Sequence, residues 1–500
     1  MKMVKSLILG SAAGLIAMSG AQAADLPVKA KAVEYVRICS LYGAGFYYMP
    51  GTDTCIKFGG YLRADTSIAA GDYSFQQTQA TQNQGSNNRL NNYWYARARM
   101  DFTVDTRTAT EYGVLRTFAD MVFSYDSTSV TGSSPSNYGT SGAASLGLYH
   151  AFIQFAGFTF GRTVSAFDAP WQSYPAGGPD TLPGGSNHVT GIDQVTYTAQ
   201  FGNGTSATIS VQDPTTLANG QAALWNTAVA PTIPAFVLGS YGANDGGGTR
   251  SPDIIGAFTV DQAWGLFKFS AAAHDIHPAY YGTTELTGHP SDKWGWAAQA
   301  ALTIKNIPTG PGDVINVQAV YTDGASKYNF QSLFPAQFAM FSGSGNGAYQ
   351  SIGFASVADG VFGAGTGIET VKTWGFRGGY THNWNEYWAS AIYGAYGALQ
   401  YGNSSKVAIC ANVAAAITAS STAVAGCNPD FNIAAIGFNT VWTPVKGFAF
   451  TADIVWTRLD QKYSGNIFIP GIASAAKPTA FYELKDQNSV SALLRAQRNF

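Results

Sequence analysis

The feature that most constrains this chain is an alternation of apolar and polar residues with a period of two, recurring in segments of about ten residues. Residues 56–66 show it clearly: even positions are apolar or small, whereas Lys57, Arg63 and Asp65 all fall on odd positions. Residues 94–105 repeat the split, with every charge again on one face. Successive side chains of a strand point to opposite faces, so each segment predicts a strand with one apolar and one charged face.

The same test finds sixteen such segments along the chain. They are 56–66, 94–105, 110–124, 145–155, 158–165, 191–201, 204–213, 251–262, 265–274, 292–304, 313–323, 371–383, 386–399, 430–442, 446–459 and 488–500. The connections alternate strictly between short and long, and the short ones are 106–109, 156–157, 202–203, 263–264, 305–312, 384–385 and 443–445. This predicts an all-β, sixteen-stranded antiparallel transmembrane β-barrel with short periplasmic turns and long extracellular loops. A soluble propeller or sandwich would not require the alternation of connections.

The composition favours strands that face lipid. Charged residues make up 12% of the chain and aromatic residues 14%, whereas charged residues make up about 25% of soluble globular proteins. Aromatic residues gather at both ends of the predicted strands, as in the two interfacial girdles of a barrel. They are Tyr93, Trp94, Trp294, Trp296, Trp374 and Trp456 on the loop side, and Phe155, Trp384, Trp388, Trp442, Phe448 and Phe500 on the turn side.

The first residues form an export signal. Lys2 and Lys5 precede an apolar run over residues 7–18, and the triplet from Ala21 to Ala23 predicts cleavage after Ala23. We expect a signal peptide at 1–23, because the apolar run is too short for a membrane-spanning helix. We expect the rest of the chain, 24–500, to form a single barrel domain. The four cysteines fall into two close pairs in an exported chain, which favours local disulfides over free thiols. The pairs are Cys39 with Cys55 and Cys410 with Cys427.

Several motifs then identify a family. They are Val33 to Cys39 (VEYVRIC), Gly45 to Cys55 (GFYYMPGTDTC), Gly59 to Arg63 (GGYLR), and Ala151 to Arg162 (AFIQFAGFTFGR) followed by Phe167 and Asp168. With these motifs the chain resembles the porins of alphaproteobacterial outer membranes. The resemblance implies a homotrimer in the Gram-negative outer membrane, in contact with lipid and lipopolysaccharide, that passes small hydrophilic solutes and ions by general diffusion. The terminal Phe500 resembles the signal read by the outer-membrane assembly machinery.

The resemblance also implies that the third long loop folds into the lumen as a constriction. By order this loop is 166–190, and its Asp168 and Asp180 would face a wall of arginines. The family pattern carries over Arg162 and the basic residues Arg63, Arg97 and Arg99 of the first two strands, and Arg116 joins them on alternation alone. Arginines opposed by carboxylates across an aqueous gap would order water and orient dipolar solutes. Alternatively, these arginines only pair with Asp65, Asp101 and Asp120 as solvated structural pairs.

The sequence gives no sign of catalysis, a cofactor, a metal site or nucleic-acid binding. None of the six histidines has a catalytic context, and the three-residue spacing of His274 and His277 puts their rings on opposite faces of a strand. Two other functions stay open. One is a substrate-specific channel, in which Tyr61, Tyr93 and Tyr95 would begin an aromatic file. The other is an adhesin or enzyme formed by loops such as 324–370 and anchored by the barrel.

Overall fold

The computed structural model describes residues 37–69, 73, 84–91, 93–127, 143–172, 174–214, 223–330, 336–343, 347–417 and 426–500. The expected signal peptide and the beginning of the first motif lie outside these residues. In the described part, no helix is both long and apolar enough to cross a membrane.

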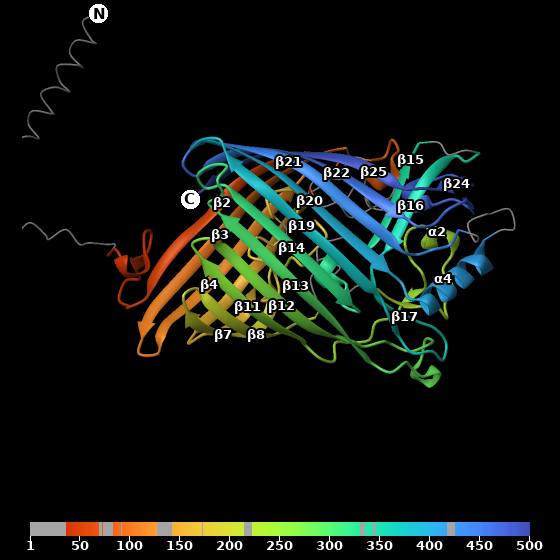
Figure 1. The fold of residues 1–500 in the computed structure, drawn as a ribbon, viewed down its shortest axis with the longest axis horizontal. Coiled ribbons are helices and arrows are strands. Elements are labelled where there is room, and N and C mark those ends of the chain that lie inside the picture. Colours follow the sequence, from red (N-terminus) through yellow and green to blue (C-terminus); the bar gives the residue numbers. More distant parts are fainter. Residues whose placement is uncertain are drawn as a thin grey trace, which may run out of the picture.

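Sixteen strands of the described chain close into one antiparallel barrel (Figure 1). The last, β25 (Gln487–Asn499), pairs with the first, β2 (Cys55–Ile68). Between them lie β3 (Trp94–Thr110), β4 (Gly113–Asp126), β5 (Ala143–Phe155), β6 (Phe158–Thr163), β7 (Ile192–Gly202), β8 (Thr205–Gln212), β11 (Asp253–Gln262), β12 (Gly265–Ile276), β13 (Lys293–Lys305), β14 (Val314–Asp323), β19 (Lys372–Asn383), β20 (Trp388–Gln400), β21 (Phe431–Val445) and β22 (Phe448–Gln461). Every predicted segment overlaps one of these strands, so the predicted fold class is confirmed.

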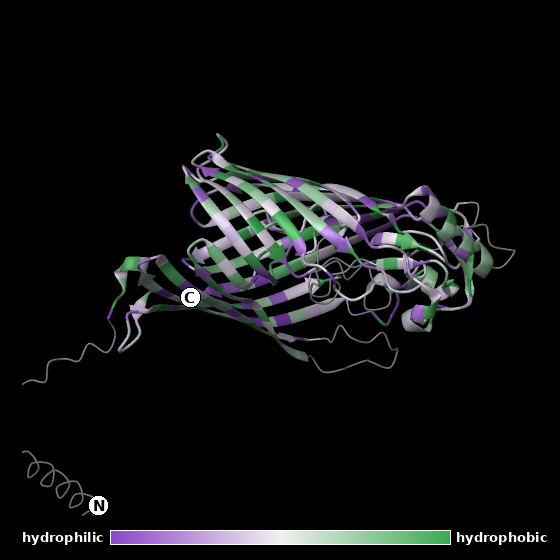
Figure 2. Ribbon diagram, turned by 90° about the horizontal axis from the view of Figure 1, so that it is seen from below, coloured by the Kyte–Doolittle hydropathy of each residue, from purple (hydrophilic) through white to green (hydrophobic). Residues whose placement is uncertain are grey.

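The apolar faces predicted for the strands lie on the outside of the barrel. On β2, Phe58 and Leu62 are exposed on the outer surface, whereas Asp65 and Ser67 are buried inside the barrel. Figure 2 shows hydrophobic and hydrophilic residues alternating along the barrel strands. An outer surface of apolar side chains and a closed hydrogen-bonded wall are what a lipid environment requires.

Short and long connections lie at opposite ends of the barrel, which we call the turn end and the loop end (Figure 1). The turns are 111–112, 156–157, 203–204, 263–264, 306–313, 384–387 and 446–447, and the C-terminus lies at the turn end. Ala156 and Gly157 both have positive φ, 49° and 87°, as a two-residue hairpin turn requires.

The predicted turn at 106–109 is wrong. These residues continue β3, which pairs with β4 as far as Thr110 and Gly113. Their polar composition is typical of a turn, but it also suits a strand that has water on both faces near the end of a barrel.

The long connections at the loop end pack together into a cap. Loop 213–252 carries β9 (Ala223–Asn226), the short helix α2 (Ile233–Phe236) and β10 (Ala243–Asn244). Loop 324–371 carries α3 (Lys327–Phe330), β15 (Gln337–Ser342), β16 (Gln350–Ser356), β17 (Ala358–Phe362) and β18 (Glu369–Thr370). Loop 462–486 carries β23 (Asn466–Ile469), a 3-10 turn at Ala473–Ala475 and β24 (Ala480–Leu484).

Two small sheets join these loops, in the orders β10-β9-β17-β18 and β15-β16-β24-β23. Each sheet contains one parallel pair between different loops, β9 with β17 and β16 with β24. A buried hydrophobic cluster includes the cap residues Trp225, Phe236, Phe354, Tyr463 and Tyr482, and it continues onto the barrel wall at residues such as Phe431 and Leu459. The cap is therefore packed onto the loop end of the barrel through a shared hydrophobic core.

Both predicted disulfides are present. Cys410 lies on α4 (Asn403–Ala416) at the loop end and bonds to Cys427, with an S–S length of 2.03 Å. Cys39 bonds to Cys55 at the turn end, with an S–S length of 1.96 Å. Shorter elements complete the described chain: 3-10 turns at Ser40–Tyr42, Gln84–Ser86 and Glu285–Thr287, and the two-residue strand β1 (Tyr47–Tyr48).

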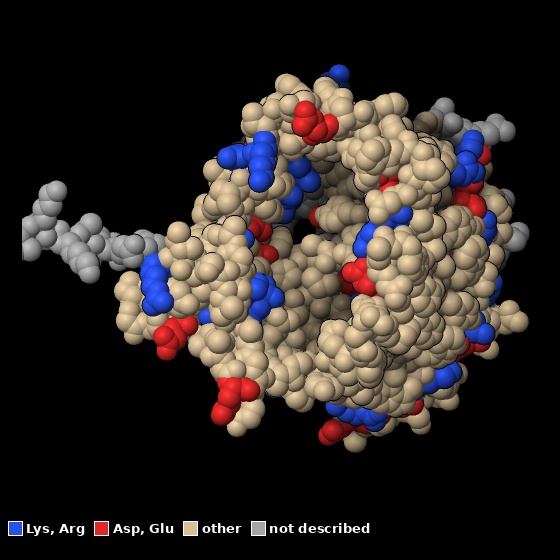
Figure 3. Space-filling model, turned by 60° about the vertical axis from the view of Figure 1, so that its left-hand side comes forward, with Lys and Arg blue, Asp and Glu red and all other residues tan. Residues whose placement is uncertain are grey.

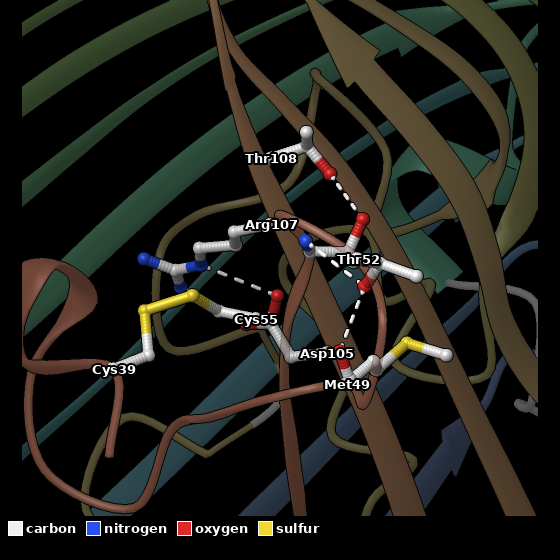
Figure 4. Close-up of a disulfide and its surroundings, with 8 residues drawn as sticks. Cys39, Met49, Thr52, Cys55, Asp105, Arg107 and Thr108 are labelled. Carbon is white, nitrogen blue, oxygen red and sulfur yellow. Dashed lines mark hydrogen bonds and ion pairs between the residues drawn. A yellow bond between two sulfur atoms is a disulfide. The ribbon is translucent and has the colours of Figure 1, made fainter. Parts of the chain in front are cut away.

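The Cys39–Cys55 bond holds a hairpin against the first barrel strand (Figure 4). Strand β1 pairs with β2 at Ile56 and Cys55. The Arg107 guanidinium, whose Nη2 lies 2.9 Å from an Asp105 carboxylate oxygen, stacks 4.8 Å from the centre of the Phe46 ring. The hairpin is thus fixed by a covalent bond, by backbone pairing and by a cation–π contact.

Candidate functional site

The connection between β6 and β7, residues 164–191, folds into the barrel and lies against one side of its wall. We call it the constriction loop. Its backbone carbonyls accept hydrogen bonds from lumen-facing side chains on β12, β13, β14, β19 and β21. The donors are Lys268 Nζ to Asp168 (2.6 Å), Gln299 Nε2 to Phe167, Asn316 Nδ2 to Pro175 (2.5 Å), Arg377 Nη2 to Ser186 (2.7 Å) and Asn439 Nδ2 to Ala176 (2.7 Å). The loop therefore narrows the lumen toward the opposite wall.

That opposite wall, formed by β25, β2, β3 and β4, carries a cluster of arginines. Arg63 on β2 lies directly across from Arg99 on β3 in the sheet. Arg495 on β25 binds Asp65 through Nε at 2.7 Å and Nη2 at 3.0 Å, while Arg63 Nε lies 3.3 Å from the same carboxylate. Like charges directly opposite each other destabilise a sheet, so this arrangement does not serve the stability of the wall. We call these strands the arginine wall.

Arg97 and Arg99 differ in how their charges are compensated. Arg97 forms a bidentate pair with Asp126, at 2.5 and 3.0 Å, and its guanidinium lies over the Tyr95 ring. Arg99 donates from Nε to the neutral Ser124 hydroxyl at 2.8 Å. The alternative of structural ion pairs thus applies to Arg97. In the Arg63–Arg99–Arg495 cluster, Arg63 and Arg495 share the Asp65 carboxylate, and Asp101 interacts electrostatically with Arg63 and Arg99.

Asp180 is the carboxylate that the constriction loop presents to this cluster. It interacts electrostatically with Arg495 across the lumen and with Tyr149 on β5. Burial, and then the nearby Asp180 carboxylate, raise the pKa of Tyr174 in the same loop well above its usual value. The Tyr174 hydroxyl therefore stays protonated and able to donate beside the arginines.

Asp168 does not face the arginines, which corrects the expectation from sequence. Its side chain is 1% exposed and lies within the constriction loop. It accepts hydrogen bonds from the Ser186 hydroxyl, the His188 backbone N–H at 2.5 Å and His188 Nδ1 at 2.9 Å. Burial alone would raise the pKa of this carboxyl, but the charge and hydrogen bonds of His188 and the Ser186 hydroxyl hold the pKa below its usual value. Asp168 ties the two ends of the loop together.

Arg162 is the second correction, because strand register places it on the outer face. It lies across from Ala151 on β5 and Asp193 on β7. Asp193 alternates with Val195 and Tyr197, which are exposed on the outer surface. Arg162 Nη1 lies 3.3 Å from the Asp193 carboxylate, so its charge is paired outside the lumen.

Arg116 faces the lumen but lies at a different level. It binds Asp105 at 3.0 Å together with Arg107, and it donates to Gln154. On β4 it is eight residues from Ser124, the partner of Arg99, which is about 26 Å at 3.3 Å per residue. Arg116 therefore belongs to a second charge cluster near the turn end.

Two residues of the site were missed by sequence reasoning. Arg495 lies on the lumen face of β25 by simple alternation, so this signal was available. Tyr174 lies in a loop, where no periodicity indicates the direction of a side chain.

The site can influence charged and dipolar solutes through its electric field, without making or breaking covalent bonds. Figure 3 shows the turn end hollowed, with basic and acidic side chains around the opening. Guanidinium groups on one wall and Asp180 on the other create a field across the lumen, which orders water and favours polar solutes. In the described ranges, no group of three or more His, Cys, Asp or Glu side chains could hold a metal ion.

Comparison with known proteins identifies the family and the fold. A family model described as the porin subfamily matches residues 25–493. Porin Omp2b of Brucella suis biovar 1 is 33% identical over 277 residues, which cover 52% of this chain and 63% of that protein. Porin Omp2b of Brucella canis matches with the same identity and coverage. The match thus spans somewhat less than two thirds of the length of these relatives.

Among solved structures, the outer membrane channel DcaP of Acinetobacter baumannii has a similar fold. It superimposes with a TM-score of 0.54 at 15% sequence identity, covering 91% of this chain and 99% of DcaP. At this identity the likeness concerns the fold alone.

Proposed function

This chain belongs to the porin subfamily, and from that membership we propose that it is a general diffusion channel of the Gram-negative outer membrane. Small hydrophilic solutes and ions would pass through the water-filled barrel passively. The observation that carries the proposal is the inward-folded constriction loop, which presents Asp180 to the Arg63–Arg99–Arg495 cluster. The family and the names of its relatives indicate a channel rather than an enzyme.

The cluster predicts a preference for anions. Arg63 and Arg495 share Asp65, and Asp101 interacts electrostatically with Arg63 and Arg99. Asp180 faces Arg495 from the loop side. Because the three guanidinium groups lie together on one wall, we expect them to attract permeating anions and to oppose cations at the level of the cluster.

The experiment is a reversal-potential measurement in planar bilayers under a salt gradient, with purified wild-type protein and the double variant Arg63→Ser/Arg99→Ser. We expect the variant to shift toward cations and to conduct more, since two charges and two long side chains leave the gap. Arg498→Ser is the matched control, because this β25 arginine is on the outer face and donates to the Lys446 carbonyl. Equal reversal potentials for wild type and double variant would refute the assignment.

The substrate-specific alternative has less support in the geometry. The rings of Tyr61 and Tyr95 lie beneath the guanidinium groups of Arg63 and Arg97 at 5.1 and 5.5 Å, and Tyr93 donates to Asn87. These tyrosines do not line up as a continuous file of open rings. Conductance that saturates with solute concentration would favour the specific channel, and linear conductance favours general diffusion.

Trimer assembly, contact with lipopolysaccharide and recognition by the assembly machinery stay predictions from the resemblance. The signal peptide at 1–23 and the domain limits 24–500 stay predictions from the sequence pattern.

A further inference from the structure

The back of the constriction loop is held by two residues of the barrel and cap. The segment Leu182–Ser186 lies against β14 and β19 on one side and against α3 of loop 324–371 on the other. All five of its residues are buried. Its backbone groups therefore need partners from these neighbours, because water does not reach them.

Arg377 on β19 supplies the donors. Its side chain is 1% exposed, and its Nε donates to Gln318 Oε1 at 2.9 Å. Nη1 donates to the carbonyls of Leu182 at 3.2 Å and Gly185 at 3.4 Å, and Nη2 donates to Ser186 at 2.7 Å. The planar guanidinium thus binds three carbonyls of one turn at once, which a single-point lysine ammonium cannot reproduce.

Asn329 on α3 supplies the acceptors. Its backbone carbonyl accepts from the N–H groups of Gly184 and Gly185 at 3.0 and 3.1 Å, and its Oδ1 accepts from Gly184 at 3.1 Å. Its Nδ2 donates to Thr373 Oγ1 on β19 at 2.9 Å. Asn329 is therefore bound to the barrel and to the constriction loop simultaneously.

Glycine allows the loop to come this close. Gly184 has φ +89°, and a Cβ there would collide with the backbone carbonyl of Phe376. A Cβ at Gly185 would collide with the Gln318 amide. The loop backbone is thus pressed against the wall at the positions where Arg377 and Asn329 bind it.

We propose that Arg377 and Asn329 are positioning residues that hold the constriction loop away from the arginine wall and so set the aperture. Neither residue faces the permeating solute. Because Asn329 belongs to the longest loop of the cap, the aperture is coupled to the packing of the cap. This inference rests on the proposed diffusion function, since it concerns the gap through which solutes pass.

The test uses two independent ways to release the loop in the full-length protein. Arg377→Met removes the donors from the wall, and Gly184→Ala introduces the collision from the loop. We expect both to lower single-channel conductance, to add brief closures, and to reduce the size limit for neutral sugars in liposome swelling, because the released loop moves into the lumen. Arg377→Lys should restore part of the conductance.

Gln461→Leu is the matched control. Gln461 is a buried β22 side chain that forms hydrogen bonds with the cap at Ile352 and Phe354, and it forms none with the described residues of the constriction loop. It should keep wild-type conductance even if its heat stability falls by as much as that of Arg377→Met.

The outcomes separate the two proposals. Wild type that does not conduct would refute the diffusion function itself. Wild-type conductance and size limit in folded Arg377→Met and Gly184→Ala, or an equal loss in Gln461→Leu, would overturn the positioning role. If Arg377→Met fails to fold, Gly184→Ala and Asn329→Ala decide the question, since both variants keep Arg377.

Discussion

Asp168 is a buried carboxylate that holds the constriction loop together and does not face the arginine wall. It connects the beginning of the constriction loop to Ser186 and His188 near the end. Its pKa is held below the usual value, so its charged form contributes to loop stability above the usual pKa of about 3.9. That contribution is lost as pH falls through the lowered pKa.

We therefore predict that acidification below about pH 4 loosens the constriction loop. Single-channel recordings across a pH series should show more current noise at the acid end. Asp168→Asn should be noisy already at pH 7, because the amide cannot provide the carboxylate that His188 binds. Acid-induced noise that is as large in Asp168→Asn as in wild type would place the titrating group elsewhere.

The arginines show where residue-level inference from sequence succeeds and fails. Alternation places Arg63, Arg97 and Arg99 on the lumen face, and the structure agrees. Arg162 was carried over from the family pattern, although it shares its face with the exposed Phe158 and Phe160 on β6. Alternation alone would have placed it outside. The burial of Asp168 depends on a loop conformation that no periodicity encodes.

At the scale of elements, β25 closes the barrel and carries the C-terminal residue. Val490 and Leu494 are exposed outside while Ser491 and Leu493 are buried inside, as alternation predicts. Phe500 is 59% exposed, and its N–H donates to the Gly60 carbonyl of β2 at 3.1 Å. The residue thus ends the seam between the last and first strands.

We predict that deleting Phe500, or replacing it with Asp, lowers the yield of heat-modifiable protein in the outer membrane while export continues. The Asp carboxylate at position 500 would replace an aromatic ring at the membrane interface, where a charge is unfavourable, and would therefore oppose pairing of the last strand with the first. Phe201→Asp is the control, since Phe201 is equally exposed at the turn end but lies within the chain on β7. Normal amounts of folded Phe500→Asp protein would contradict the role of the terminal residue in assembly.

The barrel strands could be predicted because each has one face in lipid and one in the lumen. The cap strands could not, because β16 and β17 are buried on nearly every residue and show no alternation. Their parallel pairings join loops far apart in sequence, and no local pattern specifies such partners. The sequence of these segments shows only a composition that is typical of loops.

At the scale of the whole molecule, the cap and the loop end of the barrel share one buried hydrophobic core, whereas the outer wall of the barrel faces lipid. The barrel turns its apolar side chains outward to lipid, whereas the cap buries Phe354, Phe236 and Tyr463 inside. The Phe354 and Tyr463 rings stack with centroids 4.6 Å apart. The cap core is therefore held by the hydrophobic effect, which does not stabilise the outer surface of the barrel.

We predict that Phe354→Ala destabilises the cap by about 3–5 kcal/mol, the usual cost of removing a buried Phe side chain, and leaves the barrel folded. Proteolysis of intact cells should cut the variant within the cap, while the heat-modifiable barrel band stays. Leu286→Ala, at a loop-end residue that is 94% exposed, should behave as wild type. Loss of the barrel band in Phe354→Ala would show that the cap and the barrel fold as one unit.

The disulfide-bonded hairpin at the turn end has a geometric consequence for the barrel as a whole. On the edge of β2 that faces β25, the last strand pairs up to Tyr61 and β1 takes over at Ile56 and Cys55. Only residues 57–60 separate the two partners, so the seam cannot slip far toward the turn end before β25 meets β1. The stagger accumulated around a closed barrel, its shear number, is set where the last strand meets the first, and together with the strand number it determines strand tilt and barrel radius. A hairpin outside the barrel, fixed by one covalent bond, thereby limits how wide the barrel can be.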